Sequence, residues 1–142
     1  MRYYRLEPEV AGGFGEDTII DRSSGKMVVE KLHYELDGWL GDDLLESTPC
    51  FIASERLARE IATSQLTGVY FDSAKVTQSD QFKELYPNRE IPMFVWMKVK
   101  GKAGRDDFGI APGLTLVVSE RAYDLLKTFG VSHAVVRPLE KG

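Results

Sequence analysis

The sequence has few of the residues on which small proteins build cross-links and metal centres. It contains one cysteine, Cys50, and two histidines, His33 and His133, among 142 residues. A single cysteine excludes an intramolecular disulfide framework and a multi-cysteine zinc or iron–sulfur site. The uninterrupted apolar runs, such as 92–97 and 114–118, are too short to cross a bilayer. The first residues also lack the apolar stretch of a secretory signal, so we expect a cytoplasmic protein.

The remaining composition is that of an ordinary folded protein. Hydrophobic residues make up 43% of the chain and charged residues 28%. A chain of this length buries about two-thirds of its extended surface, so it can form a core without disulfides or metal. We therefore expect a single domain over 1–142, with an acidic, turn-rich segment at 1–48 and an α+β core at 49–139.

Charge is distributed unevenly along the chain, whose net charge is −4. Residues 1–53 contain 5 basic and 11 acidic side chains, whereas the rest of the chain carries a small positive excess. The overall acidity argues against non-specific binding to nucleic acid, which needs a basic surface. The acidic segment is either a solvated face that keeps the protein soluble or a docking surface for a basic partner.

The first third of the chain shows mostly strand and turn patterns. Glycines at 11–15 indicate a loop, and no pattern assigns residues 39–49. Strands are expected at 3–6 and 32–36, with a hairpin that pairs 18–20 with 27–29.

The remaining two-thirds alternate between apolar strands and capped helices. Ser54, Ser79 and Ser119 each precede a helical pattern, because a serine hydroxyl can accept from an unpaired N–H of the first turn. The helix after Ser54 is expected to end at Gly68, a residue type that adopts left-handed backbone. Residues 101–113 read as a long loop. The expected strands cover 50–53, 69–76, 93–99, 114–118 and 134–136.

Two stretches of the sequence resemble each other. Residues 51–56, Phe-Ile-Ala-Ser-Glu-Arg, parallel 117–121, Val-Val-Ser-Glu-Arg, and each is followed by a helical pattern and then Gly-Val. This is an internal repeat of a strand–helix–strand unit. The predicted fold is α+β, with one mixed sheet, two or three helices packed mainly on one face, and the repeated unit.

Few side chains form a pattern typical of catalysis. A Cys50–His133 dyad is conceivable, but a cysteine beside an apolar strand usually behaves as a small buried hydrophobe. His33 lies in an alternating stretch and fits a surface or hydrogen-bonded strand residue better than a metal ligand. Asp106 and Asp107 could offer paired carboxylates to a metal, although a role in a turn or helix cap is favoured. The sequence therefore predicts no enzyme, no cofactor and no metal site.

Trp39 differs from the other aromatic residues because it lies among turn residues and carboxylates. It fits equally a lid on the core and an anchor in a protein interface, where tryptophan is enriched. Together with the acidic residues around it, Trp39 forms the candidate partner-binding set. The set is Asp37, Trp39, Asp42, Asp43 and Glu46.

The chain from 49 to 139 resembles a known bacterial family. The resemblance is carried by Gly-Val-Tyr-Phe at 68–71, Leu-Tyr-Pro at 85–87, Gly-Lys-Ala-Gly at 101–104 and the segment from Leu116 to His133. It is similar to immunity proteins of polymorphic-toxin systems, catalogued as domains of unknown function. A related branch carries two Cys-x-x-Cys-Gly pairs, which this chain lacks, so a zinc site there does not carry over.

The resemblance implies an immunity protein that binds a cognate toxin and neutralises it by non-covalent occlusion. A toxin with a basic cleft, such as a nuclease, would suit the acidic segment. No nucleic-acid or membrane partner is expected, and a homodimer is left open. One alternative is a small-molecule-binding domain or enzyme with a pocket near the 101–113 loop and His133. Another is a structural, self-associating module.

Overall fold

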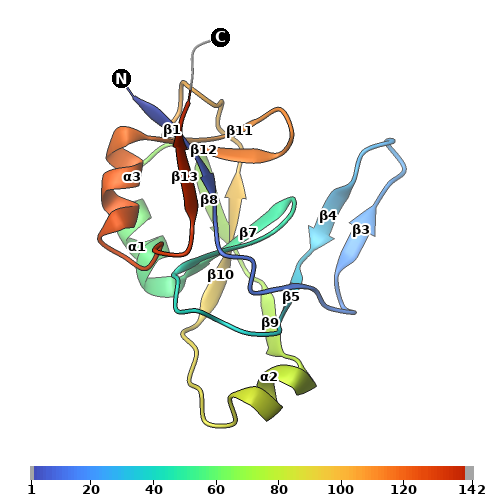
Figure 1. Cartoon of the computed structure of the whole chain (residues 1–142). Coiled ribbons are helices and arrows are strands. Elements are labelled where there is room, and N and C mark those ends of the chain that lie inside the picture. The colour runs from blue at the N-terminus through green and yellow to red at the C-terminus, as the bar shows by residue number, and fades with distance from the viewer. Residues whose placement is uncertain (1, 140–142) are drawn as a thin grey trace.

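Within residues 2–139, which the computed structural model describes, the strands form four separate sheets and are accompanied by three helices (Figure 1). Two four-stranded sheets form the body. Sheet A has the order β11 (Phe108–Ala111), β12 (Thr115–Ser119), β1 (Tyr3–Glu7) and β13 (Val135–Pro138). Sheet B has the order β6 (Leu44–Ser47), β7 (Cys50–Ser54), β10 (Phe94–Val99) and β8 (Val69–Asp72).

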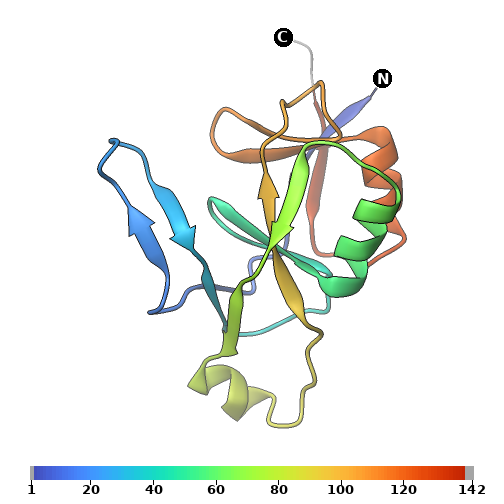
Figure 2. The same ribbon diagram turned by 180° about the vertical axis from the view of Figure 1, so that it is seen from behind.

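Two smaller sheets and the helices complete the fold. Sheet C has the order β2 (Gly12–Phe14), β5 (His33–Leu36) and β9 (Lys75–Gln78), and β5 and β9 run parallel. The hairpin of β3 (Ile19–Asp21) and β4 (Val28–Lys31) projects from the body, as the two opposite views show (Figures 1 and 2). The helices are α1 (Glu55–Thr63), α2 (Asp80–Leu85) and α3 (Glu120–Lys127).

Sheets A and B are two copies of one arrangement. In each, a hairpin leads into a helix and then into an edge strand: β6–β7–α1–β8 in one copy and β11–β12–α3–β13 in the other. The strand registers of the two copies also agree. Ser54, at the end of β7, pairs with Phe94 at the start of β10, and Ser119, at the end of β12, pairs with Tyr3 at the start of β1. The repeat expected from the sequence is confirmed, and it extends to the hairpin before each helix.

In each copy, one inner strand comes from outside the hairpin–helix–strand unit. In sheet A, β1 lies between β12 and β13, although it precedes them by most of the chain. In sheet B, β10 lies between β7 and β8, although it follows both. Each of these inner strands is antiparallel to its neighbours, so β7 and β8 run parallel with β10 between them. Each sheet is thus completed by a strand from outside its hairpin–helix–strand unit.

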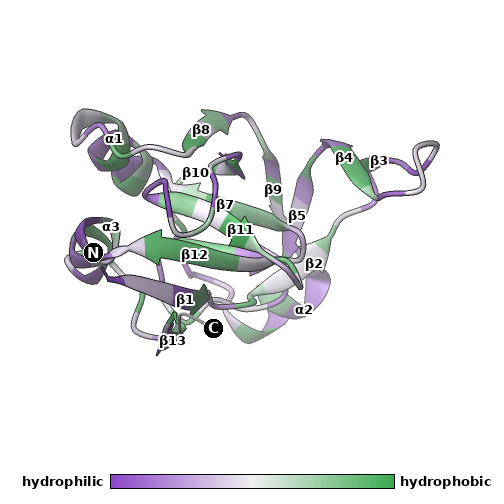
Figure 3. Cartoon of the chain, turned by 90° about the horizontal axis from the view of Figure 1, so that it is seen from above, coloured by the Kyte–Doolittle hydropathy of each residue, from purple (hydrophilic) through white to green (hydrophobic). Residues whose placement is uncertain are grey.

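Two apolar cores hold these layers together. The larger core fills the space between α1, α3 and the two main sheets, with Phe51, Met97 and Leu126 among its buried residues. The second core lies between sheet B, sheet C and α2, where Ile52 and Trp96 are buried. Sheet B is thus apolar on both faces, which explains its continuous apolar sequence. Figure 3 shows the apolar colouring along β12, β7 and β8.

The α+β class, the single domain and the three serine caps are confirmed. Ser54, Ser79 and Ser119 each accept a hydrogen bond from the third following residue. The strands differ from expectation in forming four sheets instead of one mixed sheet. Strands β1 and β6 of the acidic first segment belong to the main sheets, so the segment is no separate layer.

Three local expectations were wrong. The glycine-rich 11–15 segment contains β2, and a Cβ on Gly12 would lie 1.8 Å from the carbonyl oxygen of Glu35 in the paired strand. The 101–113 loop contains β11. Helix α1 ends before Gly68, and the left-handed residue there is Gln65, with φ of 56°. Gly68, with φ of 95°, lies against the Phe108 carbonyl instead.

Candidate functional site

Two buried aspartates occupy equivalent places in the two copies. Asp43 accepts hydrogen bonds from the Ser54 hydroxyl (2.5 Å) and from Arg56 Nε (2.9 Å), and Arg56 Nη2 reaches its other oxygen at 2.7 Å. Asp107 accepts the same three bonds from Ser119 and Arg121, at 2.7, 2.8 and 2.6 Å. Each serine also caps its helix. The serine and the arginine of each Ser-Glu-Arg sequence are therefore the hydrogen-bond donors to these aspartates.

Each aspartate also binds the segment that follows the helix of the other copy. Asp43 Oδ2 accepts from the Gly130 N–H at 2.7 Å, after α3, and Asp107 Oδ2 accepts from the Thr67 N–H at 2.8 Å, after α1. The expectation that Asp107 accepts from loop N–H groups is confirmed. The two aspartates are thus structural braces between the copies, not free carboxylates.

The hydrogen bonds keep both aspartates ionised. Hydrogen bonds from Arg121 lower the pKa of Asp107 well below its ordinary value, in spite of burial. For Asp43, burial acts to raise the pKa, but hydrogen bonds from Arg56, Ser54 and Gly130 together outweigh it and lower the pKa. Carboxylates held in this way are poor proton donors near neutral pH.

The predicted partner-binding residues divide into a buried group and an exposed group. Asp42, Asp43 and Glu46 are buried, with 1%, 2% and 9% of their surface exposed. The Glu46 carboxylate accepts from the Thr48 hydroxyl at 3.2 Å, and burial raises the pKa of Glu46. An exposed acidic patch at these three positions is therefore excluded. Their side chains lie below the surface and are not part of it.

Asp37 and Trp39, the other two predicted residues, line a surface groove of about 410 Å³. Trp39 is half-buried, donates its indole N–H to the Asp42 carbonyl at 2.8 Å and meets Phe94 edge to face. It is thus both a lid on the second core and part of an open surface. The other lining residues are Glu9, Val10, Ala11, Gly12, Gly38, Leu40 and Tyr86.

The rim of this groove carries three exposed apolar or aromatic side chains. Val10 is 66% exposed and Leu40 is 62% exposed, and the Tyr86 ring is also accessible. The Arg89 guanidinium lies 5.0 Å from the Trp39 ring, so a cation covers one side of the aromatic anchor. An apolar rim around a half-buried tryptophan is typical of a protein-binding surface.

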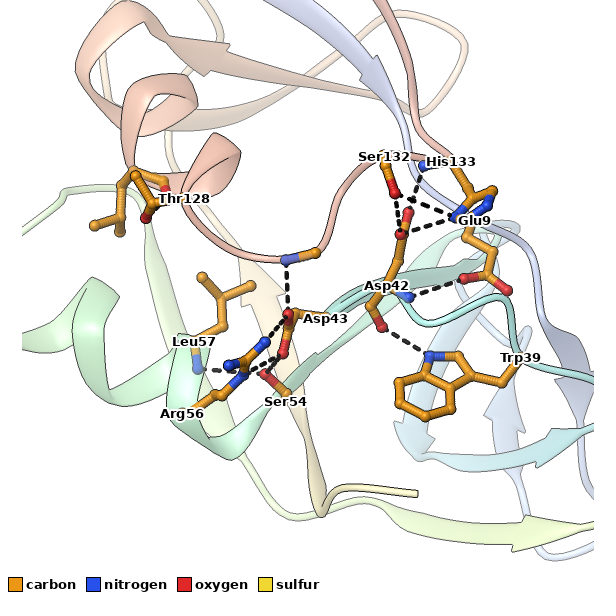
Figure 4. Close-up of polar contacts among 12 residues, drawn as sticks. Glu9, Trp39, Asp42, Asp43, Ser54, Arg56, Leu57, Thr128, Ser132 and His133 are labelled. Atoms are coloured by element: carbon orange, nitrogen blue, oxygen red, sulfur yellow. Dashed lines mark hydrogen bonds and ion pairs between the residues drawn. The ribbon is translucent and has the colours of Figure 1, made fainter. Parts of the chain in front are cut away.

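Beneath the groove lies a polar cluster of Glu9, Asp42 and His133 (Figure 4). Asp42 Oδ1 lies 3.0 Å from His133 Nδ1, and Asp42 Oδ2 accepts from the His133 N–H at 2.9 Å. Glu9 accepts from the N–H groups of Leu40 (2.7 Å) and Asp42 (3.3 Å). No sequence pattern indicates this cluster, because its members are separated by 33 and 91 positions.

The residues considered for catalysis are buried in the core or hydrogen-bonded within the fold. Cys50 is buried in the second core, and burial raises its pKa to about 11, so the thiolate is strongly disfavoured. The His33 ring is buried and lies 2.7 Å from the Thr77 hydroxyl, as expected of a hydrogen-bonded strand residue. Asp106 accepts from the Lys102 N–H at 2.7 Å within a turn.

A larger concavity, of about 970 Å³, borders the 101–113 loop. Gly104 and Arg105 contribute from that loop, and Tyr3, Tyr4 and Pro138 contribute from sheet A. His133, Asp106 and Asp107 do not line it, so the pocket considered for a small-molecule enzyme is not assembled from those residues within the part of the chain described.

Comparison with known proteins gives this chain no relative. No protein-family model, no curated protein and no solved structure matches it. Within residues 2–139, no helix is long and apolar enough to span a membrane.

Proposed function

We propose that this protein is a cytoplasmic immunity protein, which binds a cognate bacterial toxin and neutralises it by non-covalent occlusion. The groove around Trp39 is the proposed contact surface. The single observation that carries the proposal is the apolar rim of Val10, Leu40 and Tyr86 beside that tryptophan. The resemblance of residues 49–139 to immunity proteins gives the partner class.

The groove has the features of an interface core. Val10 and Leu40 expose most of their surface to water. A partner that covers them would remove this apolar surface from water, which favours binding. The Trp39 indole is already fixed by Asp42 and Phe94, so little side-chain entropy is lost when a partner packs on it. A preorganised aromatic residue with apolar neighbours is where binding energy concentrates.

Charge contributes less to the proposed binding surface than the acidic composition of residues 1–53 indicates. Four of the 11 acidic side chains in residues 1–53 are buried, namely Glu9, Asp42, Asp43 and Glu46, whereas all 5 basic ones are exposed. At the groove, Asp37 is the exposed carboxylate. A basic group of the toxin beside Asp37 would mainly speed association, while the apolar rim supplies affinity.

The test is binding to the protein encoded by the neighbouring gene, measured by calorimetry with a catalytically inactive form of that protein. Leu40→Asp places a charge on the rim and is expected to weaken binding about tenfold or more. Leu114→Asn is the matched control, since Leu114 is also exposed (50%), lies in the β11–β12 turn and has the positive φ that asparagine tolerates.

The outcomes separate this proposal from its alternatives. Unchanged binding of Leu40→Asp would exclude the Trp39 groove as the contact surface. Absence of any complex with the neighbouring gene product, and of growth protection, would argue against an immunity role. Mass measurement of the protein alone tests the self-associating module in the same experiment.

A further inference from the structure

The cluster beneath the groove contains two buried carboxylates without a lysine or arginine partner. Glu9 and Asp42 are 6% and 1% exposed. Asp43 and Asp107 each bind a guanidinium, but within residues 2–139 neither Glu9 nor Asp42 forms an ion pair with lysine or arginine. Buried charge of one sign is costly unless a cation compensates it. His133 is the single titratable cation partner that Asp42 has there.

The three side chains converge as ligands of one ion would. One ligand atom from each of Glu9, Asp42 and His133 lies within 4.8 Å of the other two. The shortest separation, 3.0 Å between His133 Nδ1 and Asp42 Oδ1, is what adjacent ligands of one metal ion show. Backbone N–H groups of Leu40 and His133 hold the two carboxylates in place. His133 is 40% exposed, so a ring rotation can close the cluster.

The other copy of the internal repeat has no equivalent of this cluster. Asp106 precedes Asp107 as Asp42 precedes Asp43, yet Asp106 only closes a turn with Lys102. Gly130 and Thr67 are equivalent positions of the two copies, and so are Val135 and Tyr70 in the edge strands. Four residues separate Gly130 from Val135, whereas two separate Thr67 from Tyr70. The longer connection carries Ser132 and His133, which contact Asp42.

The geometry points to a binding site for a divalent transition-metal ion formed by Glu9, Asp42 and His133. Two carboxylate oxygens and one imidazole nitrogen suit ions such as Zn²⁺, which bind N and O ligands at about 2.0–2.2 Å. An imidazole ligand disfavours Mg²⁺, which prefers oxygen ligands. Because Glu9 also lines the Trp39 groove, the ion would stiffen the floor of that surface. The site is a property of this chain alone and does not depend on the proposed toxin.

The test is titration of the chelator-treated, untagged full chain with ZnCl₂ by calorimetry, together with thermal unfolding. The wild type is expected to bind one ion, with a higher unfolding temperature when zinc is present. His133→Gln removes the exposed ligand with little risk to the core and is expected to weaken binding at least about tenfold. Asp106→Asn is the matched control, because it changes the equivalent aspartate of the other copy and should bind zinc like the wild type.

Each result either supports or overturns the site. Loss of zinc binding in His133→Gln together with its retention in Asp106→Asn supports it. Glu9→Gln gives a second, independent variant, for which the same loss is expected. Absence of binding by the wild type overturns the proposal, as does binding that His133→Gln leaves unchanged.

Discussion

Asp43 and Asp107 show how one residue can brace two distant parts of a chain. Each carboxylate binds the cap of its own helix through a serine and an arginine, and the end of the other helix through a backbone N–H. The arginines are more than half exposed, so most of the stabilisation comes from buried hydrogen bonds rather than from charge attraction. These aspartates are therefore expected to govern stability, not binding.

Asp107→Asn is expected to lower the free energy of unfolding by about 2 kcal/mol at pH 7. The folded-state pKa of Asp107 is lowered, so its contribution is complete above its ordinary pKa and is lost as pH falls below about 4. The difference between wild type and variant should therefore shrink in acid. Urea unfolding between pH 3 and pH 7 measures it, with the exposed Asp124→Asn as a control near zero. A difference that is constant with pH would contradict the assignment.

Single-residue roles could be predicted from the sequence where the partners are close along the chain. Ser54, Ser79 and Ser119 were assigned as caps because the accepting hydroxyl and the N–H that donates to it are three residues apart. Glu9, Asp42 and His133 could not be assembled, because they meet only where Glu9 pairs with Leu45 and the 130–133 segment contacts Asp42. Likewise, the burial of Asp42 and Asp43 depends on contacts with the 130–133 segment.

At the scale of the elements, the three helices begin in the same way but are tied down differently. The Ser79 hydroxyl accepts from the Phe82 N–H. The Ser119 hydroxyl accepts from the Ala122 N–H and also donates to Asp107. A capping serine in α1 or α3 thus joins helix, strand and hairpin, whereas the one in α2 serves its helix alone.

Ser119→Ala should consequently destabilise the protein more than Ser79→Ala. We expect a loss of about 1 kcal/mol for Ser79→Ala, the usual value for a cap. Ser119→Ala should lose about 2–3 kcal/mol, because it also leaves a buried Asp107 oxygen short of a donor. Chemical denaturation of the two variants measures the difference, and Ser54→Ala should match Ser119→Ala. Equal losses for Ser79→Ala and Ser119→Ala would show that the bond to Asp107 contributes little.

Elements were missed where glycine obscures the strand pattern. Strand β2 contains Gly12 and Gly13, and β11 contains Gly109, residues that weaken the sequence signal for a strand. In both strands the glycine allows a close approach of another segment, since a Cβ on Gly109 would lie 2.2 Å from the Ala103 nitrogen. The packing requirement that fixes glycine at these positions is visible only in the fold.

At the scale of the whole molecule, one shared core and the two aspartate braces make sheets A and B one cooperative unit. The sequence predicted the repeat but not where β1 and β10 pair, because neither strand has a local signal for the sheet it joins. The 19–31 hairpin is outside this unit, as β3 and β4 pair only with each other.

Hydrogen exchange should therefore divide the molecule into two levels of protection. The amides of Leu6 in β1 and Met97 in β10 should exchange with similar free energies, close to that of global unfolding. Amides of the β3–β4 hairpin, such as Ile20, should exchange through much smaller openings. Native-state exchange followed by NMR measures both. Markedly weaker protection of Leu6 than of Met97 would show that sheet A opens independently.

The position of β1 also constrains how the chain acquires its fold during synthesis. Its partners Ser119 and Arg137 are translated long after Tyr3 and Arg5 have left the ribosome. Sheet A can be completed only once its last strand, β13, has emerged. Until β12 has been synthesised, β1 has no strand to pair with, although β3–β4 and β6–β7 can already form. Completion of the fold therefore depends on contacts distant in sequence.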